Sequence, residues 1–510
     1  MKRLGLGVTV VSFVVGFAGC SSSSPSDSSD PSDTSATGQA ILREGVADAM
    51  VEGHAPTSVL VFLKGSADLA TPAGFAGFAT RAERGAFVHT RLVDHAKASQ
   101  RSLLDALTKE GAKVRPFHIV NAVLVNDASP RLLRQLAARA DVKSIAVDKA
   151  IPLKLVPNDE TQQTEAVEAI GSNITATGAN RVWTEFGVKG EGVVIAGQDT
   201  GVNWNHPALK SHYRGWDGTT ADHGYSWHDA IHETSQTTCP ADQKAPCDDY
   251  GHGTHTIGTV VGDDGGTNQI GMAPGAKWIA CRNMDGGVGT PSSYLECSQW
   301  FLAPYPQGAD PSTGDPSKAP DVINNSWGCP TSEGCTTGKE LVDVVHSLAS
   351  AGIVFVASAG NSGSVCGSIS DQPATIWDAT LSVGSYNHRN GAISSFSSRG
   401  PSRYPGEKEG HIGPDVAAPG ESINSAEGSG YASMSGTSMA GPHVVGEVAL
   451  LISAKPALRG NVAEITNIVT STATAKTSTQ SCEDVSGSAH PNNTWGYGII
   501  DAYAAVKSVR

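Results

Sequence analysis

Ser438 is the side chain of this 510-residue sequence best placed to act as a nucleophile. It lies in residues 436–443, Gly-Thr-Ser-Met-Ala-Gly-Pro-His, at the start of an apolar stretch that predicts a helix over 438–453. Backbone N–H groups in the first turn of a helix are unpaired and the helix N-terminus is partially positive, so an oxyanion beside Ser438 would be stabilised. A serine that only caps a helix is the alternative, which this segment alone leaves open.

Two further segments supply the groups that such a serine needs. Asp199 follows residues 193–198, an apolar run that predicts a buried parallel strand with a carboxylate at its C-terminal end, where open α/β sheets bind ligands. His252 lies between two glycines, which let other backbone segments approach the imidazole closely. A serine hydroxyl needs a base within hydrogen-bond reach, and that base needs a carboxylate to fix its tautomer. Asp199, His252 and Ser438 are therefore the predicted catalytic residues.

These segments resemble the signature motifs of the subtilisin-like serine endopeptidases, the subtilases. The matching motifs are Asp199-Thr200-Gly201, His252-Gly253-Thr254-His255 and residues 436–443, in that family's order of Asp, His and Ser. The resemblance covers residues 165–510, and within the family residues 281–285 and 300–304 are most similar to the bacillopeptidase F branch. It implies hydrolysis of peptide bonds: Ser438 attacks the carbonyl, His252 takes and returns the proton, and Asp199 orients His252.

The same resemblance implies further parts of the site. Residues 354–361 resemble the family segment whose asparagine donates to the oxyanion, so Asn361 and the backbone N–H of Ser438 are the implied oxyanion hole. Without the resemblance, Asn361 beside a glycine would be interpreted as a turn residue. Ser326, Trp327 and Gly328 resemble the edge segment that binds an extended polypeptide substrate. The residue preferred before the cut stays open: Asp371 could line that pocket, or it could be an exposed surface aspartate.

Residues 171–510 alternate between strand and helix patterns and are predicted to form the catalytic domain. The predicted strands are 193–198, 277–281, 321–325, 353–357 and 381–384, and the predicted helices are 292–302, 338–351, 438–453 and 462–472. This alternation predicts the α/β class, a doubly wound and mostly parallel sheet with helices on both faces. Residues 210–249 are predicted to be an irregular insertion that rims the cleft.

Residues 55–155 carry a separate α+β pattern. Strands are predicted at 58–64, 114–125 and 144–147, and helices at 89–110 and from Ser129-Pro130, where the serine can cap and the proline suits the first helical position. The position of this domain resembles the inhibitory propeptide of subtilases, a small ferredoxin-like domain of the inhibitor I9 type. A binding domain with another role is the alternative. The polar residues 156–170 are predicted to be the processing linker of a self-processed precursor.

The first 54 residues predict export. Residues 1–20 begin with Lys2-Arg3, continue through an apolar run and end in Phe17-Ala18-Gly19-Cys20, which resembles a lipoprotein signal peptide with lipid attachment at Cys20. An ordinary secretory signal is the alternative. Residues 21–54, rich in Ser, Asp and Pro, are predicted to be a disordered tether. The predicted location is the bacterial cell envelope or the extracellular space, with membrane contact only through the lipid.

Composition and cysteines limit the partners. A net charge of −14 argues against nucleic acid, and we expect a monomer that binds extended polypeptides and its own propeptide. Eight cysteines besides Cys20 allow four disulfides; short separations favour Cys239 with Cys247 and Cys329 with Cys335. No cofactor is expected. Ala208 stands where many subtilases have a calcium-binding aspartate, which argues against a tight structural calcium site, and weak calcium binding by loop aspartates is the alternative that stays open.

The sequence leaves two alternatives to a serine protease. One is a catalytically silent binding module on the same fold. The other is a zinc hydrolase that uses side chains between Asp199 and His252, namely His228, His232, Cys239 and Cys247. The remaining histidines of the family motifs, His255 and His443, are interpreted as core residues with satisfied hydrogen bonds.

Overall fold

The computed structural model describes residues 40–510 except 44, 56, 71–76, 157–168, 331–334, 336–339 and 404–409. The predicted signal peptide with Cys20 and most of the processing linker lie outside the described residues. The prediction that residues 21–54 form a disordered tether is wrong at its C-terminal end, where the chain forms a short strand and a short helix. Ile41–Leu42 (β1) pairs in parallel with a strand of the following domain, and Val46 and Ala49 of helix Val46–Ala49 (α1) are buried.

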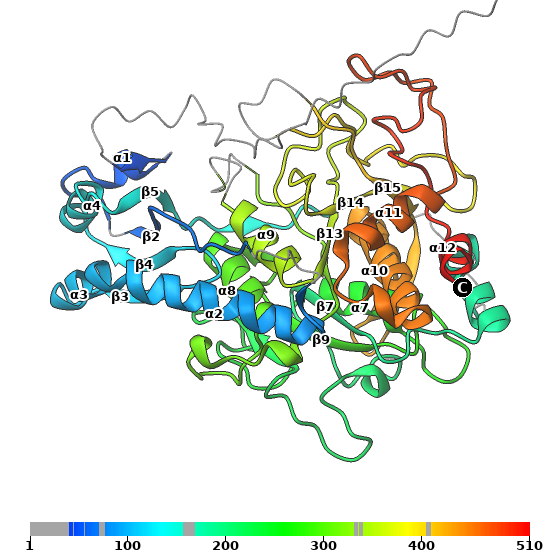
Figure 1. The fold of residues 1–510 in the computed structure, drawn as a ribbon, viewed down its shortest axis with the longest axis horizontal. Coiled ribbons are helices and arrows are strands. Elements are labelled where there is room, and N and C mark those ends of the chain that lie inside the picture. Colours follow the sequence, from blue (N-terminus) through cyan, green and yellow to red (C-terminus); the bar gives the residue numbers. More distant parts are fainter. Residues whose placement is uncertain are drawn as a thin grey trace, which may run out of the picture. The chain divides into compact units, whose positions relative to one another are not determined.

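The N-terminal domain is a five-stranded sheet with helices, in the order β1-β5-β2-β4-β3 (Figure 1). Its elements are β2 (Thr57–Leu63), α2 (Arg81–Ser99), α3 (Arg101–Lys109), β3 (Lys113–Phe117), β4 (Ala122–Ala128), α4 (Pro130–Ala137) and β5 (Val142–Val147). β2, β3, β4 and β5 pair antiparallel. This βαββαβ order is the predicted ferredoxin-like arrangement.

Sequence patterns predicted where some of these helices and strands begin or end, but not where others do. Ser129 accepts a hydrogen bond from Leu132 N, so α4 begins as predicted. The predicted helix 89–110 is instead two helices that meet at the buried Gln100, whose side-chain amide donates to Phe117 O. The predicted strand 114–125 is two strands, because its apolar run contains a turn that lacks Gly and Pro. The third strand, predicted at 144–147, is β5.

A seven-stranded parallel sheet forms the centre of the second domain, in the order β15-β14-β13-β12-β7-β9-β8. Its strands are β7 (Val194–Asp199), β8 (Trp227–Asp229), β9 (Lys277–Arg282), β12 (Val322–Asn325), β13 (Val354–Ser358), β14 (Leu381–Tyr386) and β15 (Val416–Pro419). All five predicted strands are present. β8 and β15 were missed; β8 lies in the segment predicted to be irregular and has only three residues.

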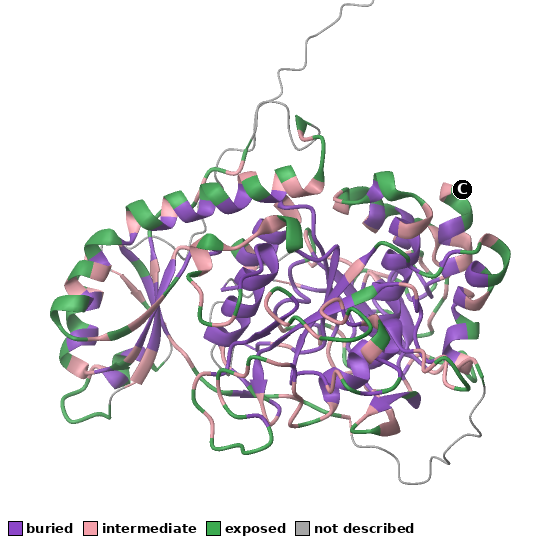
Figure 2. Cartoon of the chain, turned by 90° about the horizontal axis from the view of Figure 1, so that it is seen from below, coloured by how far each residue is buried: buried purple, intermediate pink, exposed green. Residues whose placement is uncertain are grey.

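Helices cover both faces of this sheet. They are α5 (Ser172–Ala176), α6 (Ala179–Arg181), α7 (His252–Val261), α8 (Pro291–Leu302), α9 (Val342–Ser350), α10 (Thr437–Ala454), α11 (Val462–Thr472) and α12 (Ala502–Val509). Ile195 and Val356 pack in one buried cluster with α7 and α10, whereas their chain neighbours Ala196 and Phe355 pack in another with α8 and α9. The strands are therefore buried on both faces (Figure 2), which confirms the doubly wound α/β fold.

The two domains share buried contacts. Leu60 of β2 and Phe117 of β3 belong to the same apolar cluster as Leu295 and Phe301 of α8. Polar contacts add to this face: Asp148 accepts hydrogen bonds from the backbone N and side-chain Oγ of Ser292, in the first turn of α8. The N-terminal domain thus packs on α8, one of the helices that cover the sheet.

Four pairs of cysteines lie within disulfide range. Cys239 pairs with Cys247 and Cys329 with Cys335, as predicted, and the Cα atoms of each pair lie 5.9 and 5.6 Å apart. The other pairs are Cys281 with Cys297 and Cys366 with Cys482. Among the described helices, none is both long and apolar enough to cross a membrane.

Candidate active site

The predicted catalytic side chains meet where the strand order of the parallel sheet reverses. β7 lies between β9 and β12: the next strands in the chain, β8 and β9, lie on one side of it, and β12 to β15 continue the sheet on the other side. Ligand sites of open α/β sheets lie outside the carboxyl ends of strands at such a point. Asp199 is the last residue of β7, and Ser326 directly follows the last residue of β12.

Asp199 and His252 are hydrogen-bonded to each other. His252 Nδ1 donates to both carboxylate oxygens of Asp199, at 2.8 and 3.0 Å, and both side chains are buried. Because Nδ1 carries this proton, Nε2 is the nitrogen free to accept one. The glycine after His252 is required for this approach: a Cβ on Gly253 would lie 2.1 Å from the carbonyl oxygen of Gly201.

Asp248 holds the start of the helix that carries His252, and sequence reasoning missed it. Its carboxylate accepts hydrogen bonds from Gly251 N, from Thr254 N and from Thr200 Oγ1. These bonds satisfy N–H groups at the N-terminus of α7 and tie that helix to the residue after Asp199. The sequence did carry a signal for this role, namely an acidic residue shortly before Gly251, where a helix begins.

Ser438 is the second residue of α10, as its predicted place in the first turn requires. Pro442 lies four residues further on and has no N–H, so it leaves the carbonyl of Ser438 without its helical partner. Ser326 Oγ donates to that carbonyl at 2.9 Å, and Ser438 Oγ donates to Ser326 O at 3.2 Å. Ser438 and His252 line the same pocket, although no hydrogen bond joins them among the described contacts.

Residues 151–156, the crossing segment, run into the cleft, where residues 152–156 line the pockets that contain Ser438 and His252. Ile151–Pro152 (β6) pairs antiparallel with Val288–Gly289 (β11), which in turn pairs with Met284–Asp285 (β10), and Leu153 N donates to Gly287 O at 2.8 Å. The strand β11 was not anticipated as a binding edge. The predicted substrate-binding residues Ser326, Trp327 and Gly328 line the pocket beside this segment. Trp327 stacks on Tyr294, with ring centroids 3.8 Å apart.

Asn361 contacts the backbone of the crossing segment. Its Nδ2 donates to the carbonyl oxygen of Lys154 at 3.2 Å. Its Oδ1 accepts hydrogen bonds from Thr437 N and Thr437 Oγ1, at 2.9 and 2.8 Å, which fix the orientation of the amide. One carbonyl of an extended peptide therefore meets the predicted oxyanion donor beside Ser438.

Comparison with known proteins identifies the family of this chain. A family model described as the subtilase family matches residues 190–498, more than half of the chain. The chain belongs to the subtilase family. The match spans the strand that carries Asp199, the helix of His252 and the helix of Ser438.

Relatives of this subtilase include bacillopeptidase F of Bacillus subtilis, which is 34% identical over 444 residues. That alignment covers 81% of the present chain but only 28% of bacillopeptidase F. Subtilisin E of Bacillus subtilis is 31% identical over 357 residues, 69% of this chain and 76% of that protein. An extracellular protease of Xanthomonas campestris pv. campestris is 31% identical over 351 residues, 64% of this chain and 54% of the relative.

The electrostatics of the subtilase site favour a protonatable His252. Burial alone would lower the pKa of His252, but the charge and hydrogen bond of Asp199, with the charge of Asp248, outweigh it and raise the pKa above its ordinary value of 6.5. An imidazolium formed at this position during a proton transfer is therefore stabilised by Asp199.

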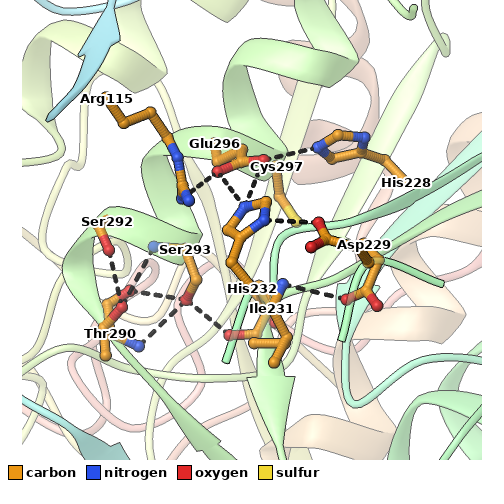
Figure 3. A network of polar contacts seen from close by, with 12 residues as sticks. Arg115, His228, Asp229, Ile231, His232, Thr290, Ser292, Ser293, Glu296 and Cys297 are labelled. Carbon is orange, nitrogen blue, oxygen red and sulfur yellow. Dashed lines mark hydrogen bonds and ion pairs between the residues drawn. The ribbon is translucent and has the colours of Figure 1, made fainter. Parts of the chain in front are cut away.

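The histidines proposed for the zinc alternative bind a carboxylate instead. His228 Nε2 and His232 Nε2 donate to Glu296 at 2.9 and 3.1 Å, and Arg115 of the N-terminal domain pairs with the same carboxylate at 2.5 Å (Figure 3). Cys239 and Cys247 pair with each other. Burial would raise the pKa of Glu296, but the two histidines and Arg115 hold it well below its usual range. In the described residues no group of His, Cys, Asp and Glu has a metal-binding arrangement.

The two remaining motif histidines are buried. His255 Nε2 lies 3.0 Å from Ile423 O, and His443 Nδ1 lies 2.9 Å from Met439 O, while His443 Nε2 contacts Asn173 Nδ2 at 2.8 Å. Burial lowers the pKa of both to about 3, so both are neutral at pH 7. Both therefore lie in the core as predicted. His443 has a partner at each ring nitrogen, whereas His255 Nδ1 is buried without a hydrogen-bond partner among the described residues, so the prediction of satisfied hydrogen bonds is wrong for His255.

Proposed function

We propose that this subtilase is a serine endopeptidase that acts on extended polypeptides. The observation that carries the proposal is the placement of one peptide carbonyl, that of Lys154, against Asn361 Nδ2 in the pocket shared by Ser438 and His252. A substrate in that position would present its carbonyl carbon to Ser438 Oγ. Binding would use backbone pairing along β11, as in strand addition.

The proposed reaction uses only groups of this chain. Ser438 Oγ attacks the carbonyl carbon while His252 Nε2 takes the hydroxyl proton and Asp199 stabilises the imidazolium. The oxyanion accepts hydrogen bonds from Asn361 Nδ2 and Ser438 N. The C–N bond then breaks as His252 returns the proton to the leaving amine, and water attacks the acyl-serine by the same route. A resident cofactor is not part of the proposal.

We also propose that residues 55–155 form an inhibitory propeptide, 156–170 a processing linker and 171–510 the catalytic domain. The burial of apolar side chains between the two domains and the placement of residues 152–156 in the cleft support this division. The attached domain has a high effective concentration, so it would inhibit strongly until the chain is cut between it and the catalytic domain. The pairs of cysteines would be disulfides, formed after export.

The proposed export route ends in a lipid anchor. The resemblance of residues 1–20 to a lipoprotein signal supports diacylation of Cys20. Residues between the anchor and the N-terminal domain would act as a tether, with the monomeric catalytic domain in the cell envelope or released after processing. Mass spectrometry of the N-terminal peptide from a bacterial host tests this point: a diacylated Cys20 is expected, and an unmodified Cys20 would contradict it.

Processing is tested by comparing two precursors in a protease-deficient host. The Ser438→Ala variant should accumulate as the uncut chain, whereas the unaltered protein should yield a species that begins between residues 154 and 169. A Ser433→Ala variant, which changes a hydroxyl in the neighbouring strand Gly430–Met434 (β17), controls for nonspecific effects. Normal trimming of the Ser438→Ala protein would refute self-processing.

A further inference from the structure

The pocket beside the Lys154 carbonyl holds two charged side chains of opposite sign. Its lining includes Ser326, Trp327, Gly328, Asn361 and Ser438, together with the ammonium-bearing Lys154 and the carboxylate-bearing Asp371. Every other described lining residue is uncharged at pH 7. Apart from Lys154, which belongs to the crossing segment, the walls of this pocket therefore offer an incoming basic side chain one carboxylate and no cation.

Asp371 stands directly against the pocket wall. A Cβ added to Gly328 would lie 3.2 Å from Asp371 Cβ and 3.5 Å from Asp371 Oδ2. Asp371 Oδ1 accepts a hydrogen bond from Ser370 Oγ at 2.8 Å. The absence of a side chain at Gly328 thus leaves space next to Oδ2 for an incoming group.

The position of Asp371 is fixed by the residue that follows it. Cys329 N donates to Gln372 O at 2.7 Å, and the buried Gln372 side chain accepts from Leu341 N and donates to Glu340. Cys329 is in turn held by its pairing with Cys335. These contacts hold Asp371 in a fixed position beside Gly328. A residue that sets specificity needs such a fixed position.

The register of the crossing segment identifies which side chain the pocket receives. Because the carbonyl of Lys154 meets Asn361 Nδ2, the peptide bond at the reacting position is Lys154–Leu155. Leu155 and Val156 line the neighbouring pocket that contains His252. The pocket with Asp371 therefore receives the side chain before the cut. Lys154 is exposed and forms no ion pair with Asp371 among the described contacts, but its long flexible stem can carry the ammonium toward the carboxylate.

We propose that Asp371 selects Lys or Arg immediately before the scissile bond, and that the precursor is first cut between Lys154 and Leu155. This inference rests on the proposed function and narrows its substrate class. An apolar pocket without a carboxylate discriminates by size alone, whereas an opposite charge rewards a basic group and opposes an acidic one.

The test compares peptide substrates that differ only before the cut, with Lys, Phe or Glu at that position. The mature protein should have the highest kcat/KM on the Lys peptide and the lowest on the Glu peptide. In Asp371→Asn the ratio of kcat/KM for Lys over Phe should fall at least about tenfold, because the carboxylate partner is lost. Asp378→Asn, which neutralises an aspartate paired with His346 outside the pocket, is the matched control and should keep the ratio.

The outcomes separate this inference from the proposed function. A preference for Phe, or an unchanged ratio in Asp371→Asn, would overturn the inference and leave a serine endopeptidase. Cleavage of none of the peptides would overturn both. N-terminal sequencing of the first processed species should begin at Leu155, and Lys154→Gln should slow that cut while Lys143→Gln on β5 should not. A first cut elsewhere, or an equal rate in Lys154→Gln, would contradict the assigned register.

Discussion

Glu447 is a buried acid in the helix that carries Ser438, and it should make the fold less stable as pH rises. Its side chain is fully buried among the apolar residues of α10, and neither carboxylate oxygen has a hydrogen-bond partner among the described residues. Burial raises the pKa of Glu447 from 4.5 to about 8, with a smaller effect from the charge of Asp501. The folded protein therefore keeps this group neutral at pH 7.

The direction of the pH effect follows from this difference. Above pH 4.5 the unfolded chain loses the Glu447 proton, whereas the folded chain keeps it until about pH 8. The contribution of Glu447 to the free energy of unfolding should fall across this window and stay at its lower value above about pH 8. At about 1.4 kcal/mol for each pKa unit, the full effect is roughly 5 kcal/mol, an upper limit because the site can relax.

The substitution Glu447→Gln removes the ionisation and keeps the shape of the side chain. Thermal unfolding of the Ser438→Ala precursor, which cannot digest itself under the proposed mechanism, gives the assay. At pH 5, the Tm values of the Ser438→Ala precursor and of the same precursor carrying Glu447→Gln should agree within a few degrees. At pH 8, the precursor carrying Glu447→Gln should have a Tm higher by several degrees. Glu464→Gln on the exposed face of α11 (Val462–Thr472) is the control. Parallel Tm profiles between pH 5 and 8 would refute the assignment of a neutral Glu447.

Two further predictions concern the candidate active site. The kcat/KM should rise with pH through a single limb with a midpoint above 6.5, because His252 must be neutral to act as a base; Asp248→Asn should move this limb to lower pH, since the charge of Asp248 helps to raise the pKa of His252. The control Asp378→Asn should leave the pH midpoint of kcat/KM unchanged. An unchanged midpoint in Asp248→Asn would contradict the electrostatic role of Asp248. Asn361→Ala should lower kcat by about a hundred- to a thousandfold through loss of an oxyanion donor, with little change in KM, and a turnover within threefold of the parent would remove Asn361 from the mechanism.

The sequence predicted the elements whose signals are local. Residues 193–198 read as a buried strand because both faces of a parallel sheet are covered, and β7 occupies Val194–Asp199. Ser129 and Pro130 predicted the start of α4 because capping depends on neighbouring residues alone. The position of Ser438 in the first turn of α10 was predicted for the same reason.

What the sequence did not predict depends on distant partners. The break between α2 and α3 occurs where Gln100 donates to the carbonyl of Phe117, 17 residues away. β8 is a strand only because three residues pair with β9. The binding edge β11 has two residues and no apolar pattern, and its pairing with β6 joins residues of two domains. The contacts of Glu296 with Arg115, His228 and His232 likewise require the folded chain.

Covalent labelling of the mature protein with a fluorophosphonate tests the central claim most directly. The reagent reacts with a serine hydroxyl only where a base and an oxyanion hole activate it. We expect stoichiometric labelling, with the modified peptide containing Ser438, and loss of labelling in Ser438→Ala but not in Ser433→Ala. Absence of labelling in the processed protein, or a label on another residue, would contradict the account of this subtilase as a serine endopeptidase.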